Sequence, residues 1–86
     1  MMAFGEALSW FGWQMSRALD ANAHKGGWTG DSALALLRRL RQETDELDRA
    51  IRQKKLPGDI IREAADVANF AMMIADNARV GSKNRL

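Results

Sequence analysis

One apolar stretch limits the folds open to this chain more than any other feature. Between Ala64 and Ala75 the sequence reads AADVANFAMMIA, in which only Asp66 and Asn69 are polar. In a helix, apolar side chains would therefore point in almost every direction, as is typical of a helix buried on several sides. A chain of 86 residues cannot easily surround such a helix by itself. The segment thus predicts close helix packing that another copy of the chain completes.

Strand patterns are missing, because the chain has no tyrosine, few valines and no alternating apolar run. Apolar side chains recur instead at helical spacing, and they predict helices over residues 3–23, 31–53 and 59–79. Residues 80–86 are interpreted as a polar tail. The expected fold is all-α, a single domain over residues 1–86. In it, a helical hairpin and an N-terminal helix complete a four-helix-bundle core by homo-oligomerisation.

Two apolar rows define the faces that the first two helices should bury. In the first helix the row comprises Phe4, Leu8, Phe11, Met15, Ala18 and Leu19. In the second helix it comprises Ala33, Leu36, Leu37, Leu40, Leu47, Ala50 and Ile51. Trp10 and Trp13 add apolar surface to the first helix, so we interpret them as core or subunit contacts.

The composition excludes several kinds of site. The chain has no cysteine, which rules out disulfides and thiolate metal ligands, and its single histidine rules out a zinc site built on several imidazoles. We interpret that histidine, His24, as a surface residue of a loop. Oligomerisation, or a hard metal held by carboxylates, is the remaining source of extra stability.

Charge and hydropathy bear on the partners of the chain. Its net charge of +2 combines 13 basic with 11 acidic residues, a balance that does not favour nucleic acid as a partner. The first residues lack the basic start and the cleavage site of a signal peptide. No apolar run approaches the roughly 20 residues that span a membrane. We therefore expect a soluble cytoplasmic protein that does not enter a membrane.

Two pairs of carboxylates interrupt the apolar rows. Glu43 stands in the core-facing row of the second helix, and Glu46, three residues on, is its neighbour on the helix surface. Glu63 and Asp66 repeat this spacing in the third helix. A carboxylate in an apolar row is costly unless something neutralises its charge.

The two pairs should face each other across the hairpin. Glu46 and Glu63 are equally far from the turn along the sequence, and so are Glu43 and Asp66. At a rise of about 1.5 Å per residue, the four carboxylates reach similar depths on antiparallel helices. Such a cluster suits a hard divalent cation, so the sequence predicts a site for Mg²⁺, or Mn²⁺, on these four residues.

A structural alternative is open for the same acids. The spacings E-x-x-E and E-x-x-D are common on solvated helix faces, where they bind no metal. The acids could instead pair with nearby guanidinium groups, those of Arg38, Arg39, Arg49 and Arg62.

The order of the two motifs resembles a known family. The chain reads ETDE over residues 43–46 and, after a spacer, EAADVANFAMMIAD over residues 63–76, and NAHKGGW precedes the second helix. In these features it is similar to the MazG-like members of the all-α NTP pyrophosphatase superfamily, over roughly residues 14 to 78. Many relatives have a further Glu where this chain has Gln42.

This resemblance implies a reaction and a site. The family hydrolyses a nucleoside triphosphate between the α- and β-phosphates to a monophosphate and pyrophosphate, usually in housecleaning of the nucleotide pool. Glu43, Glu46, Glu63 and Asp66 would be the metal ligands and catalytic residues. One of the glutamates could also accept the proton of the attacking water. Family members assemble as homodimers or as dimers of dimers.

Further residues are candidates for substrate binding. Asn69, one turn beyond the last acid, could contact a ligand or a metal-bound water, or bond a neighbouring backbone group. Trp28 could stack on a base or pack its loop onto the hairpin, and Lys25 could meet a phosphate. Lys54, like Lys55, could reach phosphates from the turn or only complement the helix C-terminus.

Two other classes of function compete with hydrolysis. A degenerate family member could be a non-catalytic helical homo-oligomer that binds a protein or a nucleotide. The isoelectric point near 9.5 would suit a nucleic-acid binder, as would the basic cluster of Arg38, Arg39 and Arg41, but no recognisable nucleic-acid-binding motif accompanies them. Pyrophosphate release from nucleoside triphosphates, with and without Mg²⁺, separates the enzyme from both alternatives.

Overall fold

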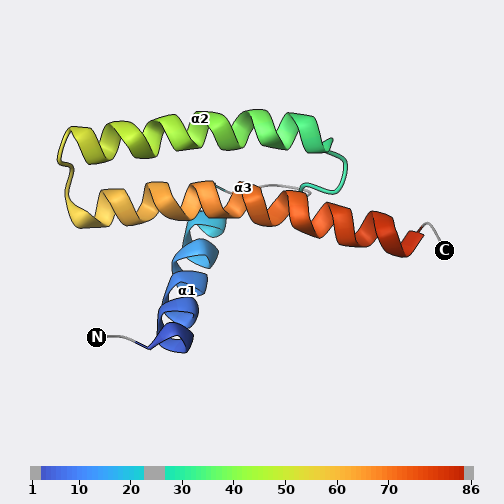
Figure 1. Ribbon diagram of the computed structural model, residues 1–86, viewed down its shortest axis with the longest axis horizontal. Coiled ribbons are helices and arrows are strands. Elements are labelled where there is room, and N and C mark those ends of the chain that lie inside the picture. Colours follow the sequence, from blue (N-terminus) through green and yellow to red (C-terminus); the bar gives the residue numbers. More distant parts are fainter. Residues whose placement is uncertain (1–2, 23–26, 85–86) are drawn as a thin grey trace.

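The computed structural model describes residues 3–22 and 27–84. This part of the chain contains three helices and no strand, which confirms the all-α prediction; they are α1 (Phe4–Asn22), α2 (Ala33–Arg52) and α3 (Pro57–Asn84). Figure 1 shows α2 and α3 side by side as a hairpin, with α1 running at a steep angle to them. None of the described helices is both long enough and apolar enough to cross a membrane.

Local sequence explains where the hairpin helices begin. Ser32 caps α2, because its Oγ accepts a hydrogen bond from the backbone N–H of Ala35 at 3.1 Å. Pro57 occupies the first position of α3. The backbone N–H of a residue at this position makes no hydrogen bond within the helix, so proline, which lacks that group, fits there without loss. Each of these helices therefore begins two residues from its predicted start.

The end of α3 differs from the prediction. We expected the helix to end near Arg79, whereas it continues to Asn84, so residues 80–84 of the expected polar tail are helical. Gly81 is the weakest helix former in this segment, and a glycine inside a helix costs only about 1 kcal/mol relative to alanine. No proline follows to stop the helix.

The turn between α2 and α3 places a lysine in the left-handed region of backbone space. The N–H of Lys54 donates to the carbonyl of Ile51 at 3.1 Å, and the N–H of Lys55 donates to the carbonyl of Ala50 at 3.0 Å. These two bonds form a Schellman motif, which usually has glycine at the position that Lys54 occupies with a φ of 52°. A residue with a Cβ costs roughly 1 kcal/mol there.

The core lies where α2 and the loop before it meet α3. Its buried side chains are Leu36, Phe70 and Met73, and those packed against them are Leu19, Trp28, Leu40, Met72 and Ile74. Within the described residues, α1 contacts α3 but not α2. One bond of this contact runs from Asn69 Nδ2 to the backbone carbonyl of Met15, at 3.0 Å. Helix α3 is thus covered on two sides, as its apolar sequence predicted.

The N-terminal end of the apolar row of α1 is exposed. Phe4 is 92 % exposed and Leu8 75 %, because the first half of α1 projects away from the hairpin (Figure 1). Trp10 and Trp13 are exposed as well, so the prediction that they could be core residues of this chain is wrong. The predicted row of α2 is also wrong at its two ends, which are the exposed residues Ala33 and Ile51.

Replacing Lys54 with glycine should stabilise the fold. Glycine adopts a positive φ without steric cost, so Lys54→Gly should raise the free energy of unfolding by about 0.5–1 kcal/mol. In a chain of this size that change raises the melting temperature by a few degrees. Lys54→Ala is the matched control, because it removes the same side chain but keeps a Cβ. Equal melting temperatures of the two variants would contradict backbone strain at this position.

Candidate metal centre

Three carboxylates meet where α2 faces α3. Glu43 from α2, and Glu63 and Asp66 from α3, each offer one oxygen atom, and these three atoms lie within 4.8 Å of one another. All three residues are half-buried. The antiparallel hairpin therefore brings the carboxylates to one depth, as their equal distances from the turn predicted.

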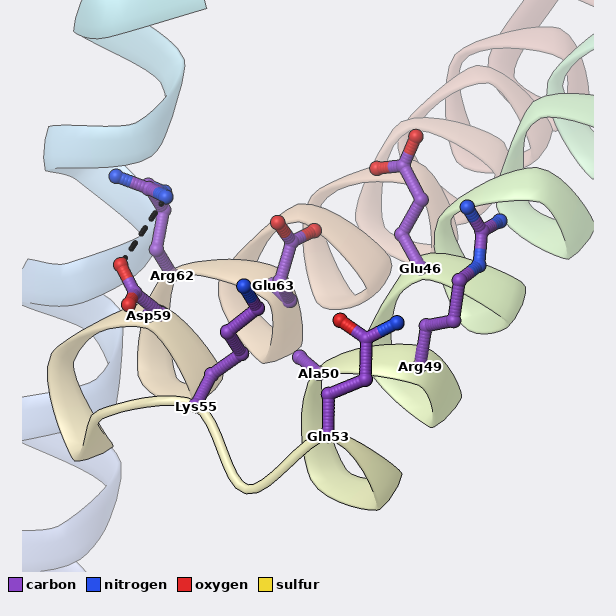
Figure 2. A pocket seen from close by; sticks show the side chains of 8 residues that line it. All are labelled: Glu46, Arg49, Ala50, Gln53, Lys55, Asp59, Arg62 and Glu63. Carbon is purple, nitrogen blue, oxygen red and sulfur yellow. Dashed lines mark hydrogen bonds and ion pairs between the residues drawn. The ribbon is translucent and has the colours of Figure 1, made fainter.

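Glu46 lies at the solvent side of this group. It is exposed, yet it is close enough for its hydrogen bond and charge to raise the pKa of Glu43, and it raises the pKa of Glu63 as well. Figure 2 shows the carboxylates of Glu46 and Glu63 projecting to the same side from the two facing helices. The structure therefore gathers all four predicted residues, with Glu46 outside the tight group of three.

Burial and mutual repulsion disfavour negative charge in this cluster. Burial is the largest cause that raises the pKa of Glu43 to about 7, followed by a hydrogen bond with Glu46 and the charges of Glu46, Asp66 and Glu63. The pKa of Glu63 is also raised, first by burial and then by the charges of Glu46 and Asp66, although Arg62 lowers it in part. Without a cation, the fold therefore holds Glu43 partly protonated at neutral pH.

Two oxygen atoms of the cluster have no hydrogen-bond donor among the described residues. They are Glu43 Oε2 and Glu63 Oε2, and both are buried. A buried charged oxygen without a partner is costly. A divalent cation with oxygen ligands would remove that cost and oppose the repulsion between the carboxylates, so these residues fit Mg²⁺ or Mn²⁺.

The nearest arginines make weak or outward-directed contacts. Arg39 Nη2 lies 3.9 Å from Glu43 Oε1, at the outer limit of an ion pair, and its guanidinium lies over the Phe70 ring at 5.0 Å. Arg62 is instead directed to Asp59, with 3.4 Å between Nη2 and Oδ1 (Figure 2). Arg39 therefore forms a long ion pair with Glu43, as the structural alternative predicted, whereas Arg62 pairs with Asp59 instead of with the cluster.

A groove opens from the cluster towards the turn. It has a volume of about 460 Å³ and is lined by Glu46, Arg49, Ala50, Gln53, Lys55, Asp59, Arg62 and Glu63. In Figure 2 the side chain of Lys55 extends from the turn towards the side on which the Glu63 carboxylate lies. Three cationic side chains thus line a groove that borders the carboxylates. Cations beside a metal centre are suited to binding phosphate groups.

The structure separates the two lysines of the turn. Lys55 lines the groove, whereas Lys54 is exposed and is not among the lining residues. The sequence favoured Lys54 over Lys55 as the phosphate contact, although nothing in this pair of lysines indicates which side chain faces the acids. It did not identify Gln53 at all, and it considered Arg49 only as an ion-pair partner. Lys25 and His24 lie outside the described residues.

Trp28 fixes its loop onto α3, far from the carboxylates. Its Nε1–H donates to Asp76 Oδ2 at 3.1 Å, and its backbone carbonyl accepts a bond from Asn77 Nδ2 at 3.0 Å. Hydrogen bonds from Trp28 and Arg79 hold the pKa of Asp76 below its usual value. Asp76 is about 15 Å along the helix from Asp66. In this chain Trp28 therefore makes the loop-packing contacts that the sequence offered as one alternative.

Asn69 likewise makes the backbone contact that was one of its two predicted alternatives. It is only 3 % exposed, and it donates to the carbonyl of Met15 in α1. Its Oδ1 has no hydrogen-bond partner among the described residues. Asn69 thus ties α1 to α3 one turn away from Asp66.

Comparisons with protein-family models, with characterised proteins and with solved structures found no match to this chain. Its function is therefore inferred from the geometry of the carboxylate cluster and from the resemblance carried by the sequence motifs.

Without metal, the protein should lose stability as the pH rises. The pKa of Glu43 is raised from 4.5 to about 7 in the fold, so folding favours the protonated group. The stability that this provides is complete below pH 4.5 and is lost as the pH rises through about 7. Thermal melts in EDTA across this range should show a decline on the order of 2 kcal/mol.

Glu43→Gln is the matched control for this experiment. It removes the carboxyl whose pKa is raised to about 7 and should reduce the decline, leaving the part that comes from Glu63. Millimolar Mg²⁺ should reverse the trend in the native protein, because the cation binds deprotonated carboxylates and so stabilises the fold more at higher pH. A melting temperature at neutral pH that is the same in EDTA and in Mg²⁺ would contradict the metal centre.

Proposed function

We propose that this protein is a Mg²⁺-dependent nucleoside triphosphate pyrophosphohydrolase that converts (d)NTP to (d)NMP and pyrophosphate in nucleotide-pool housecleaning. The observation that carries the proposal is the meeting of Glu43, Glu63 and Asp66 within 4.8 Å, beside a groove lined by three cationic side chains. The order of the E-x-x-E and E-x-x-D motifs, which resembles MazG-like proteins, supports the same reaction.

The roles of the four acids follow from their positions. Glu43, Glu63 and Asp66 would hold the cation, with Glu46 as a further ligand at its exposed side. When bound, Mg²⁺ supplies positive charge that neutralises phosphate oxygens and activates a water for in-line attack. Glu46 is the most exposed of the four, so its carboxylate is the one best placed to accept a proton from that water.

The groove would hold the phosphates that leave as pyrophosphate. Within the described residues, neither Arg49 nor Lys55 forms an ion pair with an acid, although both line the groove next to Glu46 and Glu63. Their charges are therefore available to phosphate oxygens, and Arg49 can donate two parallel hydrogen bonds. Cations at the end of the groove towards the turn would hold the β- and γ-phosphates and offset the negative charge that they carry when they leave as pyrophosphate.

Turnover should depend on the clustered acids. Asp66→Asn and Glu46→Gln keep the side-chain shape but remove charge, so each should lower kcat by at least about a hundredfold while helix content is kept. Asp45→Asn is the matched control, because Asp45 is an exposed acid adjacent to Glu46. The assay is pyrophosphate release from a panel of nucleoside triphosphates with Mg²⁺. Native rates in Asp66→Asn would contradict the assignment.

The same assay compares the two lysines of the turn. Lys55→Ala should raise KM about tenfold, since it removes one charge–phosphate contact. Lys54→Ala should leave KM unchanged, because the Lys54 side chain does not line the groove. A larger effect of Lys54→Ala than of Lys55→Ala would contradict the placement of the phosphates.

The exposed half of α1 favours assembly, and the proposal includes a homodimer or a dimer of dimers. Phe4 and Leu8 on one side of α1, and Trp13 on the opposite side, leave large apolar side chains in water, which a soluble chain usually covers with a partner. Light scattering should therefore find at least twice the 9.6 kDa of one chain. Leu8→Glu should dissociate the assembly, whereas Ser9→Glu, its exposed polar neighbour, should not. An active species of one chain's mass would contradict this prediction.

The same exposed apolar surface favours a second candidate function, a non-catalytic homo-oligomeric binding module. Nucleotide or protein binding without pyrophosphate release from any nucleoside triphosphate, in the presence of Mg²⁺, would select that candidate over the enzyme.

A further inference from the structure

A second cavity lies between α1 and the start of α3. It has a volume of about 510 Å³ and is lined by Gln14, Arg17, Ala18, Ala21, Gly58, Ile61 and Arg62. Arg62 also lines the groove beside the carboxylates, so the two spaces adjoin at one side chain. In Figure 2, Arg62 points away from Glu63 and towards α1. We call this second space the α1–α3 cavity, and its size is that of a small-molecule site, roughly 300–1,000 Å³.

The walls of the α1–α3 cavity are partly apolar and partly polar. Ala18, Ala21 and Ile61 provide small apolar surfaces, while Gln14 and Arg17 bring a carboxamide and a guanidinium from α1. The carboxamide of Gln14 can both donate and accept hydrogen bonds. Arg17 has no ion-pair partner among the described residues, so its charge is open to a ligand.

A nucleoside matches these walls. Its base has two apolar faces, which need flat apolar contact, and polar edges, which need a donor and an acceptor side by side. A guanidinium can stack on a base or bond a phosphate oxygen. An inorganic polyphosphate has no apolar face, so it would gain nothing from Ala18, Ala21 and Ile61.

We propose that the α1–α3 cavity holds the nucleoside part of the substrate, with Gln14 at the edge of the base and Arg17 beside the sugar and α-phosphate. The remaining phosphates pass Arg62 into the groove lined by Arg49 and Lys55. This order places the α–β bond between the two spaces, next to the carboxylates. The inference rests on the proposed function, because it takes the ligand to be a nucleoside triphosphate.

Two probes test the assignment by calorimetry in Mg²⁺. The first is a set of α,β-methylene nucleoside triphosphates, in which the α–β bond cannot be hydrolysed, and the second is tripolyphosphate, which has no nucleoside. Ala21→Phe fills the cavity from its exposed edge, and Gln14→Leu removes the amide while keeping its size. Each variant should lower the affinity for the methylene analogues about tenfold or more and change the affinity for tripolyphosphate by less than about twofold.

Ala78→Phe is the matched control, since it adds the same ring at an exposed alanine far along α3 and should change neither affinity. Unchanged analogue affinity in both cavity variants would overturn the inference, as would an equal loss for tripolyphosphate or no analogue binding to the native protein. If Ala21→Phe releases pyrophosphate at the native rate, the assignment of the nucleoside to the α1–α3 cavity is overturned, while the proposed hydrolysis stands. If the native protein binds the analogues but releases no pyrophosphate, and Ala21→Phe abolishes that binding, the nucleoside site stands and the proposed hydrolysis is refuted.

Discussion

The structure depends on how the hairpin accommodates negative charge between α2 and α3. Glu43, Glu63 and Asp66 approach within 4.8 Å in a half-buried position, and Glu43 Oε2 and Glu63 Oε2 have no donor among the described residues. Repulsion and burial both oppose this arrangement, so the pKa of Glu43 rises to about 7. Protonation compensates the cluster in part, and a bound cation would compensate it further, so metal binding would be linked to folding.

Helix α3 connects this cluster to the rest of the molecule. One face carries Glu63 and Asp66 against α2, and an adjacent face carries Asn69, which bonds α1 through Met15. Arg62 lies between these faces and lines both the groove and the α1–α3 cavity. Helix α3 thus packs against both α2 and α1, and it lines both the groove that borders the acids and the α1–α3 cavity.

The sequence predicted the parts of the site that follow from helix geometry. The equal distances of the four acids from the turn needed only a rise of about 1.5 Å per residue and a short connection, and the structure brings three of them together with Glu46 beside them. The sequence could not predict which lysine of the turn faces the groove. The side-chain directions there are set by the left-handed backbone at Lys54, which belongs to the Schellman motif. Nor could it predict that α1 leaves the hairpin, since its apolar row does not say what covers Phe4 and Leu8.

The central claim is that the carboxylate cluster binds a divalent metal, and the anomalous X-ray signal of Mn²⁺ tests it most directly. Crystals grown with saturating Mn²⁺ should show one or more anomalous peaks between α2 and α3, within direct bonding distance of oxygens of Glu43, Glu63 and Asp66. Glu43 Oε2 or Glu63 Oε2 should then be a metal ligand. No peak at this position, with Glu43 instead held by the guanidinium of Arg39, would contradict the account.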